Sequence, residues 1–140
     1  MLYLDTSLLV AALTHETKTA RVQTWLGDQD PAGLAISEWV VTEFSAALSV
    51  KLRARQIEAD GRATGLDTFA RWCADSLAVL PISSLHFRVA ARFADQHAFG
   101  LCAGDSLHLA ISADHGATLC TLDRRLSEAG SALGVRMVLL

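Results

Sequence analysis

Long apolar runs and leader features are missing from this 140-residue sequence. No run approaches the roughly 20 apolar residues that a membrane-spanning helix needs. The opening segment, MLYLDTSLLVAAL, has no basic residue and carries Asp5 inside its apolar stretch, which is not typical of a signal peptide. We therefore predict a cytoplasmic protein with no membrane partner.

Cysteine and proline are scarce, with three and two residues respectively. Cys73, Cys102 and Cys120 form no C-x-x-C pair, so the sequence indicates neither a zinc knuckle nor a disulfide framework, and we expect buried free thiols. The lack of low-complexity tracts and internal repeats leaves no candidate linker. Residues 1–140 are therefore predicted to form a single domain.

An excess of positive charge is also missing, because the formal net charge is −3. This balance at first disfavours a nucleic-acid partner. If four of the 15 acidic residues held a metal ion, 11 would remain against 12 Lys and Arg residues, a balance of +1. Ten of those 12 are arginines, which suit bidentate contacts to phosphate. Composition therefore permits RNA binding but does not require it.

Several familiar catalytic motifs are absent as well. Neither G-x-x-x-x-G-K-[ST] nor G-x-G-x-x-G occurs, which disfavours the common phosphate-binding loops. No serine stands in a nucleophile elbow followed by the acid and histidine of a hydrolase triad. The chemistry must therefore come from other residue types.

The sequence does contain short apolar runs that alternate with helical periodicity, such as the four-residue steps of Val40, Phe44 and Leu48. This alternation predicts an α/β fold, with a central, mostly parallel sheet of about five short strands and helices on both faces. The predicted strands are Leu2–Asp5, Leu34–Ile36, Ala78–Ile82, Thr118–Leu122 and Val135–Leu139. The predicted helices are Thr6–Leu13, Lys18–Leu26, Ser37–Arg55, a helix carrying Leu66 to Leu77 after a soft boundary at Gly61 and Gly65, Ser84–Ala98, Gly104–Asp114 and Arg124–Ala129.

Four acidic residues occupy informative positions in this predicted fold. Asp5 and Asp123 end the first and fourth strands, Asp105 stands in the first turn of a helix, and Glu43 borders the apolar stripe of the long helix. Ligands of open parallel sheets bind at the carboxyl ends of the strands. Each Asp alone could simply cap a helix, and Glu43 alone could be solvated. Clustered carboxylates, however, need a compensating cation, and an oxygen-only set favours Mg²⁺ or Mn²⁺.

The five histidines compete poorly for a catalytic role. His15, His86, His97 and His115 fall near the ends of predicted elements, where we expect them at the surface. His108 lies three residues after Asp105 on the same helix, and it is the one that could approach the acids. We favour a structural role for it.

The acids lie in segments that resemble the four motifs of PIN-domain ribonucleases: LYLDTS, the helix around Glu43, LCAGDSLHLAIS and TLCTLDRRL. The resemblance covers essentially the whole chain. The chain is also similar in size to the toxin subunits of VapBC toxin–antitoxin pairs. The segment from Gly104 to Ala110 is the specific part of the match, whereas the Glu43 motif is weak by itself.

This resemblance implies that Asp5, Glu43, Asp105 and Asp123 form a catalytic metal site for Mg²⁺ or Mn²⁺. Thr6, Ser7 and Thr121 match its supporting hydroxyl positions. The implied activity is metal-dependent endonucleolytic cleavage of RNA, leaving 5′-phosphate and 3′-hydroxyl ends. The implied partners are a cognate antitoxin, seated in an apolar groove near the site, and a second copy of the chain.

Other functions stay open at this point. The protein could be a PIN-fold nuclease of RNA processing outside a toxin system, or a binding module that does not cut. A response-regulator-like receiver would need adjacent acids after the first strand and a lysine after the last, whereas the only lysines here are Lys18 and Lys51. The apolar stripe from Leu66 to Leu77 could contact a partner or pack on the core of its own chain.

Overall fold

Five short apolar segments form one parallel sheet in the computed structural model, which describes residues 1–140. The strand order is β3-β2-β1-β4-β5, and every neighbouring pair is parallel. This arrangement confirms the predicted α/β class and its parallel sheet. The strands are β1 (Leu2–Leu4), β2 (Leu34–Ser37), β3 (Ala78–Leu80), β4 (Thr118–Thr121) and β5 (Arg136–Leu139).

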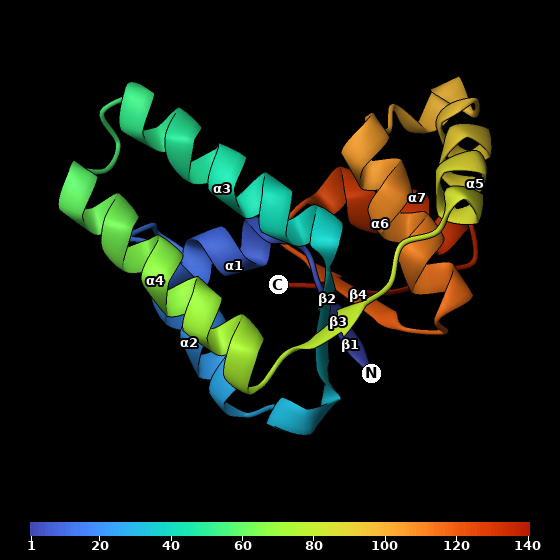
Figure 1. Ribbon diagram of the computed structural model, residues 1–140. Coiled ribbons are helices and arrows are strands. Elements are labelled where there is room, and N and C mark those ends of the chain that lie inside the picture. The colour runs from blue at the N-terminus through green and yellow to red at the C-terminus, as the bar shows by residue number, and fades with distance from the viewer.

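Seven α-helices and two short 3₁₀ helices connect the strands. As Figure 1 shows, α1 to α4 lie on one side of the sheet and α5 to α7 on the other, so helices cover both faces as predicted. The helices are α1 (Thr6–Leu13), α2 (Thr19–Gly27), α3 (Glu38–Arg53), α4 (Ala59–Asp75), α5 (Ser84–Ala94), α6 (Ala103–Asp114) and α7 (Arg124–Ala132), with 3₁₀ helices at Pro31–Gly33 and His97–Phe99. None of these helices is long and apolar enough to cross a membrane.

Several predicted boundaries are wrong. Helix α7 ends at Ala132 rather than Ala129, and β3 ends at Leu80 rather than Ile82. Helix α5 ends at Ala94 rather than Ala98, and a 3₁₀ turn then leads to Gly100, whose φ of 61° is the left-handed conformation that glycine tolerates. Helix α4 begins at Ala59 and contains both glycines of the predicted soft boundary. Gly65 is there because α3 packs closely, since a Cβ atom on it would lie 3.2 Å from Cδ1 of Leu48.

The core centres on β1 and α1. Strand β1 is flanked on both sides by other strands, and Tyr3 and Leu4 are fully buried. Helix α1 packs against α2, α3, α4 and β4, so nearly all of its residues are buried rather than one stripe. Burial on both faces explains why LYLDTSLLVAAL is apolar apart from Asp5, Thr6 and Ser7.

The apolar stripe of α4 packs mainly on the core of its own chain. Phe69 is buried and its ring lies 4.3 Å from that of Phe44 on α3, while Trp72 and Cys73 are partly buried against the same core. The exposed large apolar side chains lie elsewhere, at Met1 and on α3, β3, α5 and β5. They include Val50, Val79, Leu85 and Phe87.

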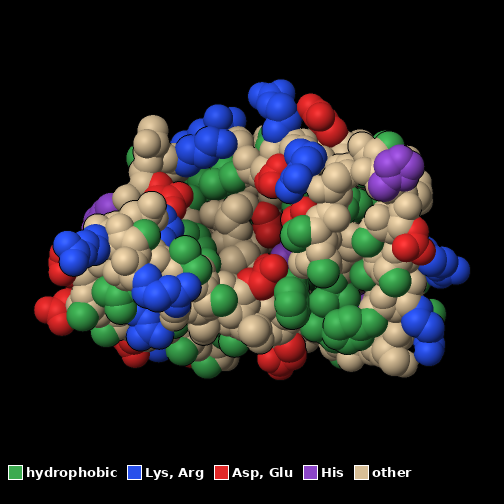
Figure 2. All heavy atoms as spheres, turned by 90° about the horizontal axis from the view of Figure 1, so that it is seen from above, with side chains coloured by type: hydrophobic (Ala, Val, Ile, Leu, Met, Phe, Trp, Pro, Cys, Tyr) green, Lys and Arg blue, Asp and Glu red, His purple; other side chains and the backbone are tan.

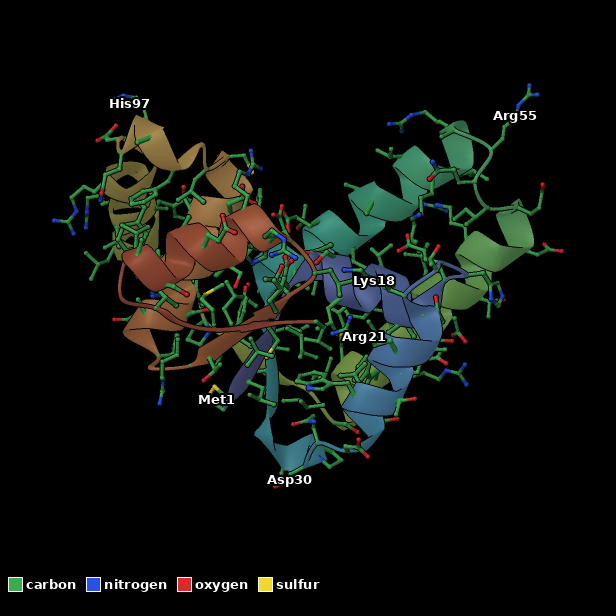
Figure 3. The ribbon with its side chains drawn as sticks, turned by 180° about the vertical axis from the view of Figure 1, so that it is seen from behind. Met1, Lys18, Arg21, Asp30, Arg55 and His97 are labelled. Carbon is green, nitrogen blue, oxygen red and sulfur yellow. The ribbon has the colours of Figure 1, made fainter.

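The strand order places a topological switch point beside β1. From β1 the chain moves through β2 to β3 on one side, and it then returns to add β4 and β5 on the other. The carboxyl ends of β1 and β4 are therefore adjacent, which is where ligands of open parallel sheets bind. In Figure 3, Arg55 lies beyond the end of α3 and His97 lies between α5 and α6. These two groups of helices extend beyond the carboxyl edge of the sheet on opposite sides.

Candidate acidic site

All four predicted acids line one open pocket of about 360 Å³ at the carboxyl edge of the sheet. Asp5 follows β1, Asp123 follows β4, Glu43 lies in the second turn of α3, and Asp105 lies in the first turn of α6. Figure 2 shows acidic side chains gathered in a hollow, with Lys and Arg side chains on the surface around it. The other lining residues are Thr6, Ser7, Ala46, Ala47, Val50, His108 and Leu126.

The acids are not equally close together. Asp5, Glu43 and His108 form the tightest group, with candidate ligand atoms that lie within 4.8 Å of one another. Asp105 and Asp123 line the same pocket without joining that group. The structure therefore brings the four predicted acids to one pocket and adds a histidine that sequence reasoning had placed in a structural role.

Asp5 is held by the predicted hydroxyl residues. Its Oδ2 atom accepts hydrogen bonds from Ser7 Oγ at 2.6 Å and from Thr121 Oγ1 at 2.7 Å. Thr121 Oγ1 also accepts a hydrogen bond from the backbone N–H of Asp123 at 3.0 Å, which ties the end of β4 to the end of β1. These hydrogen bonds fix the Asp5 carboxylate, and only 8% of its side chain is exposed.

Glu43 is held by the third predicted hydroxyl and by His108. Its Oε2 atom accepts from Thr6 Oγ1 and from His108 Nε2, each at 2.7 Å. Burial alone would raise the pKa of Glu43, but these hydrogen bonds and the charge of His108 lower it below its ordinary value. For His108, burial opposes the charged form, yet the hydrogen bond to Glu43 and the charge of Asp5 raise its pKa.

Asp105 and Asp123 both act at helix ends, as the capping alternative allowed. Asp123 Oδ1 accepts from the backbone N–H of Leu126 at 3.1 Å and caps α7. Asp105 forms a capping box with Cys102, in which its Oδ2 atom accepts from the N–H of Cys102 at 3.0 Å. The expectation of buried thiols is wrong for Cys102, which is exposed because it caps α6.

One oxygen of each carboxylate is therefore held by hydrogen bonds. Asp105 Oδ1 and Asp123 Oδ2 accept no hydrogen bond, and Asp5 Oδ1 meets only His108 Nε2 at 3.4 Å. The Trp39 side chain faces the Glu43 carboxylate beside Gly104. Hard divalent cations such as Mg²⁺ prefer oxygen ligands such as carboxylates. The donor set of this pocket fits such a cation, and helix capping occupies only one oxygen each of Asp105 and Asp123.

Gly104, directly before Asp105, allows α6 to lie close to Glu43. A Cβ atom on Gly104 would lie 2.5 Å from Glu43 Oε1 and 3.4 Å from Trp39 Nε1. Helix α6 can therefore approach the Glu43 carboxylate only because position 104 has no side chain. Glycine is needed here to leave room for the Glu43 carboxylate. It is not needed for an unusual backbone conformation, since Gly104 has no positive φ.

The sequence did not predict the contacts of His108 with the acids, nor those of Tyr3 and Ser37, which lie next to His108 in the core. His108 Nδ1 lies 3.0 Å from Tyr3 Oη, which in turn lies 2.7 Å from Ser37 Oγ. The signals were present, because His108 follows Asp105 by one helical turn and Tyr3 precedes Asp5 by two residues in a strand. Ser37 ends the strand that neighbours β1.

A second group of histidines lies between α5 and α6. His86 was expected at the surface, but it is only 4% exposed. Its Nδ1 accepts from the N–H of Ser83 at 3.0 Å, so Nε2 carries the ring proton and donates to Asp114 Oδ2 at 3.0 Å. His115 lies beside this pair, but His86 keeps no lone pair for a metal ion. We interpret His86 as a hydrogen-bonded clamp between the two helices.

Comparison with known proteins agrees with this fold. Residues 2–131 match the family model of the PIN domain. No curated protein sequence matches the chain at a significant level. The solved structures that resemble it include FitAcB from Neisseria gonorrhoeae, with 18% identity, a TM-score of 0.72, and coverage of 98% of this chain and 96% of that one.

Two further solved structures are similar. VapC20 from Mycobacterium tuberculosis, described as a sarcin-ricin loop cleaving toxin, shares 15% identity at a TM-score of 0.75, covering 93% of this chain and 95% of that one. VapBC-1 from nontypeable Haemophilus influenzae shares 11% identity at a TM-score of 0.68, covering 99% of this chain and 98% of that one. At such identities these structures show the shared fold.

The parallel sheet, with its acidic pocket at the switch point, defines a small α/β protein with a candidate site among carboxylates. The family match then makes the assignment specific: the chain belongs to the PIN domain family. The resemblance recognised in the sequence is confirmed.

Gly104→Ala is expected to displace Glu43 without unfolding the protein. The new Cβ would meet the mobile end of a side chain, and alanine favours helix over glycine by about 0.5–1 kcal/mol. A crystal structure of the variant should show the Glu43 carboxylate moved away from His108 Nε2. The control is Gly61→Ala, since no atom lies within 4 Å of a Cβ at Gly61. A Glu43 carboxylate that keeps its native position in Gly104→Ala would contradict this account.

Proposed function

We propose that the protein is a metal-dependent endoribonuclease and the toxin of a toxin–antitoxin pair. The observation that carries the proposal is the pocket that Asp5, Glu43, Asp105 and Asp123 line together, each with one carboxylate oxygen fixed by hydrogen bonds. Four carboxylates at one pocket repel each other unless a cation compensates their charge. Mg²⁺ or Mn²⁺ fits this donor set, and the family assignment supports nuclease chemistry.

The roles of the residues follow from their contacts. A bound divalent ion would lower the pKa of a water molecule and stabilise charge on a phosphodiester. Asp5, Glu43, Asp105 and Asp123 would hold that ion. Thr6 keeps Glu43 in place, whereas Ser7 and Thr121 keep Asp5 in place. Fixed ligands reduce the rearrangement that must accompany the reaction.

Arginines at the rim of the pocket suit an RNA substrate. Arg124 and Arg125 follow Asp123 directly at the start of α7. Arg125 Nη2 lies 3.5 Å from Asp105 Oδ2, and 58% of its side chain is exposed. An exposed guanidinium beside the carboxylates can contact backbone phosphate while the acids hold the cation. This arrangement accounts for nucleic-acid binding by a chain whose formal net charge is −3.

A cognate antitoxin is the proposed protein partner. One wall of the acidic pocket is apolar, formed by Ala46, Ala47 and the exposed Val50 of α3. A partner segment that covers this wall would also close the pocket to RNA. The similarity to a VapC toxin and to a VapBC complex favours this role over an RNA-processing nuclease of the same fold. A short reading frame for an antitoxin next to the gene would separate the two functions.

A second copy of the chain is the proposed partner of another face. Phe87 on α5 is 56% exposed and stands beside an apolar hollow of about 220 Å³. A projecting ring and a hollow on the same patch are what a two-fold symmetric contact needs, because each copy offers both. The remaining lining residues are Trp39, Ala90, Ala91, Ala94, Ala103, Ser106 and Leu107.

Asp105→Asn should lower cleavage of single-stranded RNA at least about a hundredfold, roughly 2.7 kcal/mol of barrier. The amide keeps the size of the side chain and can still accept the hydrogen bond from Cys102, so folding should change little. EDTA should abolish cleavage by the native protein, and Mg²⁺ or Mn²⁺ should restore it. Mapping of new 5′ RNA ends provides the measurement.

The matched control for this variant is Asp114→Asn on the same helix. Asp114 lies outside the acidic pocket, and an asparagine there can still accept from His86. Its rate should stay close to that of the native protein. Rapid cleavage by Asp105→Asn together with slow cleavage by Asp114→Asn would show that the wrong acids were assigned.

Phe87→Glu should shift the protein from dimer to monomer in sedimentation velocity at micromolar concentration, since a charge would be buried in an apolar contact. Val79→Glu, at an exposed apolar residue on β3 outside this face, should leave the dimer intact. A native protein that sediments as a monomer, or a Phe87→Glu variant that remains dimeric, would remove this face as the contact.

A further inference from the structure

We propose that His108, supported by Tyr3 and Ser37, is a positioning residue that fixes the Glu43 and Asp5 carboxylates for the divalent cation. This inference rests on the proposed function, because it concerns the same metal site. It assigns a role to three buried polar residues that the hydrolytic chemistry itself does not use.

The three residues form a continuous hydrogen-bonded chain from the core to the pocket. Ser37 and Tyr3 are fully buried, and His108 is 2% exposed. The chain runs from Ser37 Oγ to Tyr3 Oη (2.7 Å), then to His108 Nδ1 (3.0 Å), and from His108 Nε2 to Glu43 Oε2 (2.7 Å). It joins β2, β1, α6 and α3, the elements that meet at the pocket.

The donors and acceptors along the chain are determined at its pocket end. Ionised carboxylates only accept hydrogen bonds, so His108 Nε2 must carry a proton to contact Glu43 Oε2 and Asp5 Oδ1. The other ring nitrogen then faces Tyr3. The hydroxyl groups of Tyr3 and Ser37 can each turn to donate or accept, so Nδ1 always has a partner. The ring is therefore held from both sides.

This geometry sets the orientation of the Glu43 carboxylate. Thr6 and His108 both bind Oε2, while Gly104 lets α6 come close on the side of Oε1. Without the Nε2 donor, the Glu43 carboxylate could rotate and lose this preset orientation. Removal of residues that orient metal ligands typically weakens metal binding by about 10–100-fold.

A purely structural role explains the chain less well. Burying three polar side chains costs free energy unless every group is hydrogen-bonded, and apolar residues could fill the same volume. Two other buried serines, Ser106 and Ser112, have no hydrogen-bond partner at all, so the fold does not pair every buried hydroxyl. The Ser37–Tyr3–His108 chain is paired along its whole length and ends on two candidate metal ligands.

The test compares two substitutions at His108 by titration with Mn²⁺, followed by electron paramagnetic resonance. The side-chain amide of His108→Gln reaches the place of Nε2 and keeps a donor toward Glu43. His108→Asn places its amide near Nδ1, so it keeps the contact to Tyr3 and loses the donor. We expect His108→Asn to weaken Mn²⁺ binding by about 10–100-fold, and His108→Gln to bind several-fold more tightly than His108→Asn.

Tyr3→Phe supplies a second variant that does not alter the histidine. It removes only the hydroxyl that holds Nδ1, and we expect Mn²⁺ binding to weaken by about tenfold. Ser112→Ala is the control for Tyr3→Phe. The Ser112 hydroxyl is buried on α6, the helix of His108, and has no hydrogen-bond partner. Equal Mn²⁺ affinities of the two folded His108 variants, or native affinity in Tyr3→Phe, would overturn the inference. If the native protein bound no Mn²⁺, the proposed function itself would fail.

Discussion

The mutual repulsion of four carboxylates is the constraint on which this structure depends. Asp5, Glu43, Asp105 and Asp123 come from four separate segments, and each would be easier to place in solvent than in a shared pocket. The protein reduces this cost by donating hydrogen bonds to one oxygen of each acid. The resulting set of fixed carboxylates has the chemistry that a hard divalent cation prefers.

The fold supplies these donors from elements that are already required for stability. The two aspartates that follow β1 and β4 line the same pocket because the topological switch lies between those strands. Capping of α6 and α7 holds Asp105 and Asp123, so two helix ends and two site residues share the same interactions. Gly104 then allows α6 to approach Glu43. Stability and site geometry are thus provided by the same contacts.

The sequence predicted those parts of the molecule that local pattern controls. Apolar runs located all five strands, and an acid after the first and the fourth strand predicted the edge at which the site lies. The role of His108 was missed because it depends on contacts with Tyr3 and Glu43, 105 and 65 residues away. The burial of His86 was missed for the same reason, since its partner Asp114 lies 28 residues away on another helix.

The position of a bound Mn²⁺ ion tests the central claim most directly. A crystal of the native protein soaked in Mn²⁺ and measured at the manganese absorption edge would locate the ion by its anomalous signal. The account predicts an ion in the acidic pocket, about 2.0–2.3 Å from carboxylate oxygens of at least two of Asp5, Glu43, Asp105 and Asp123. An ion bound only beside His86, Asp114 and His115, or no bound ion at all, would contradict it.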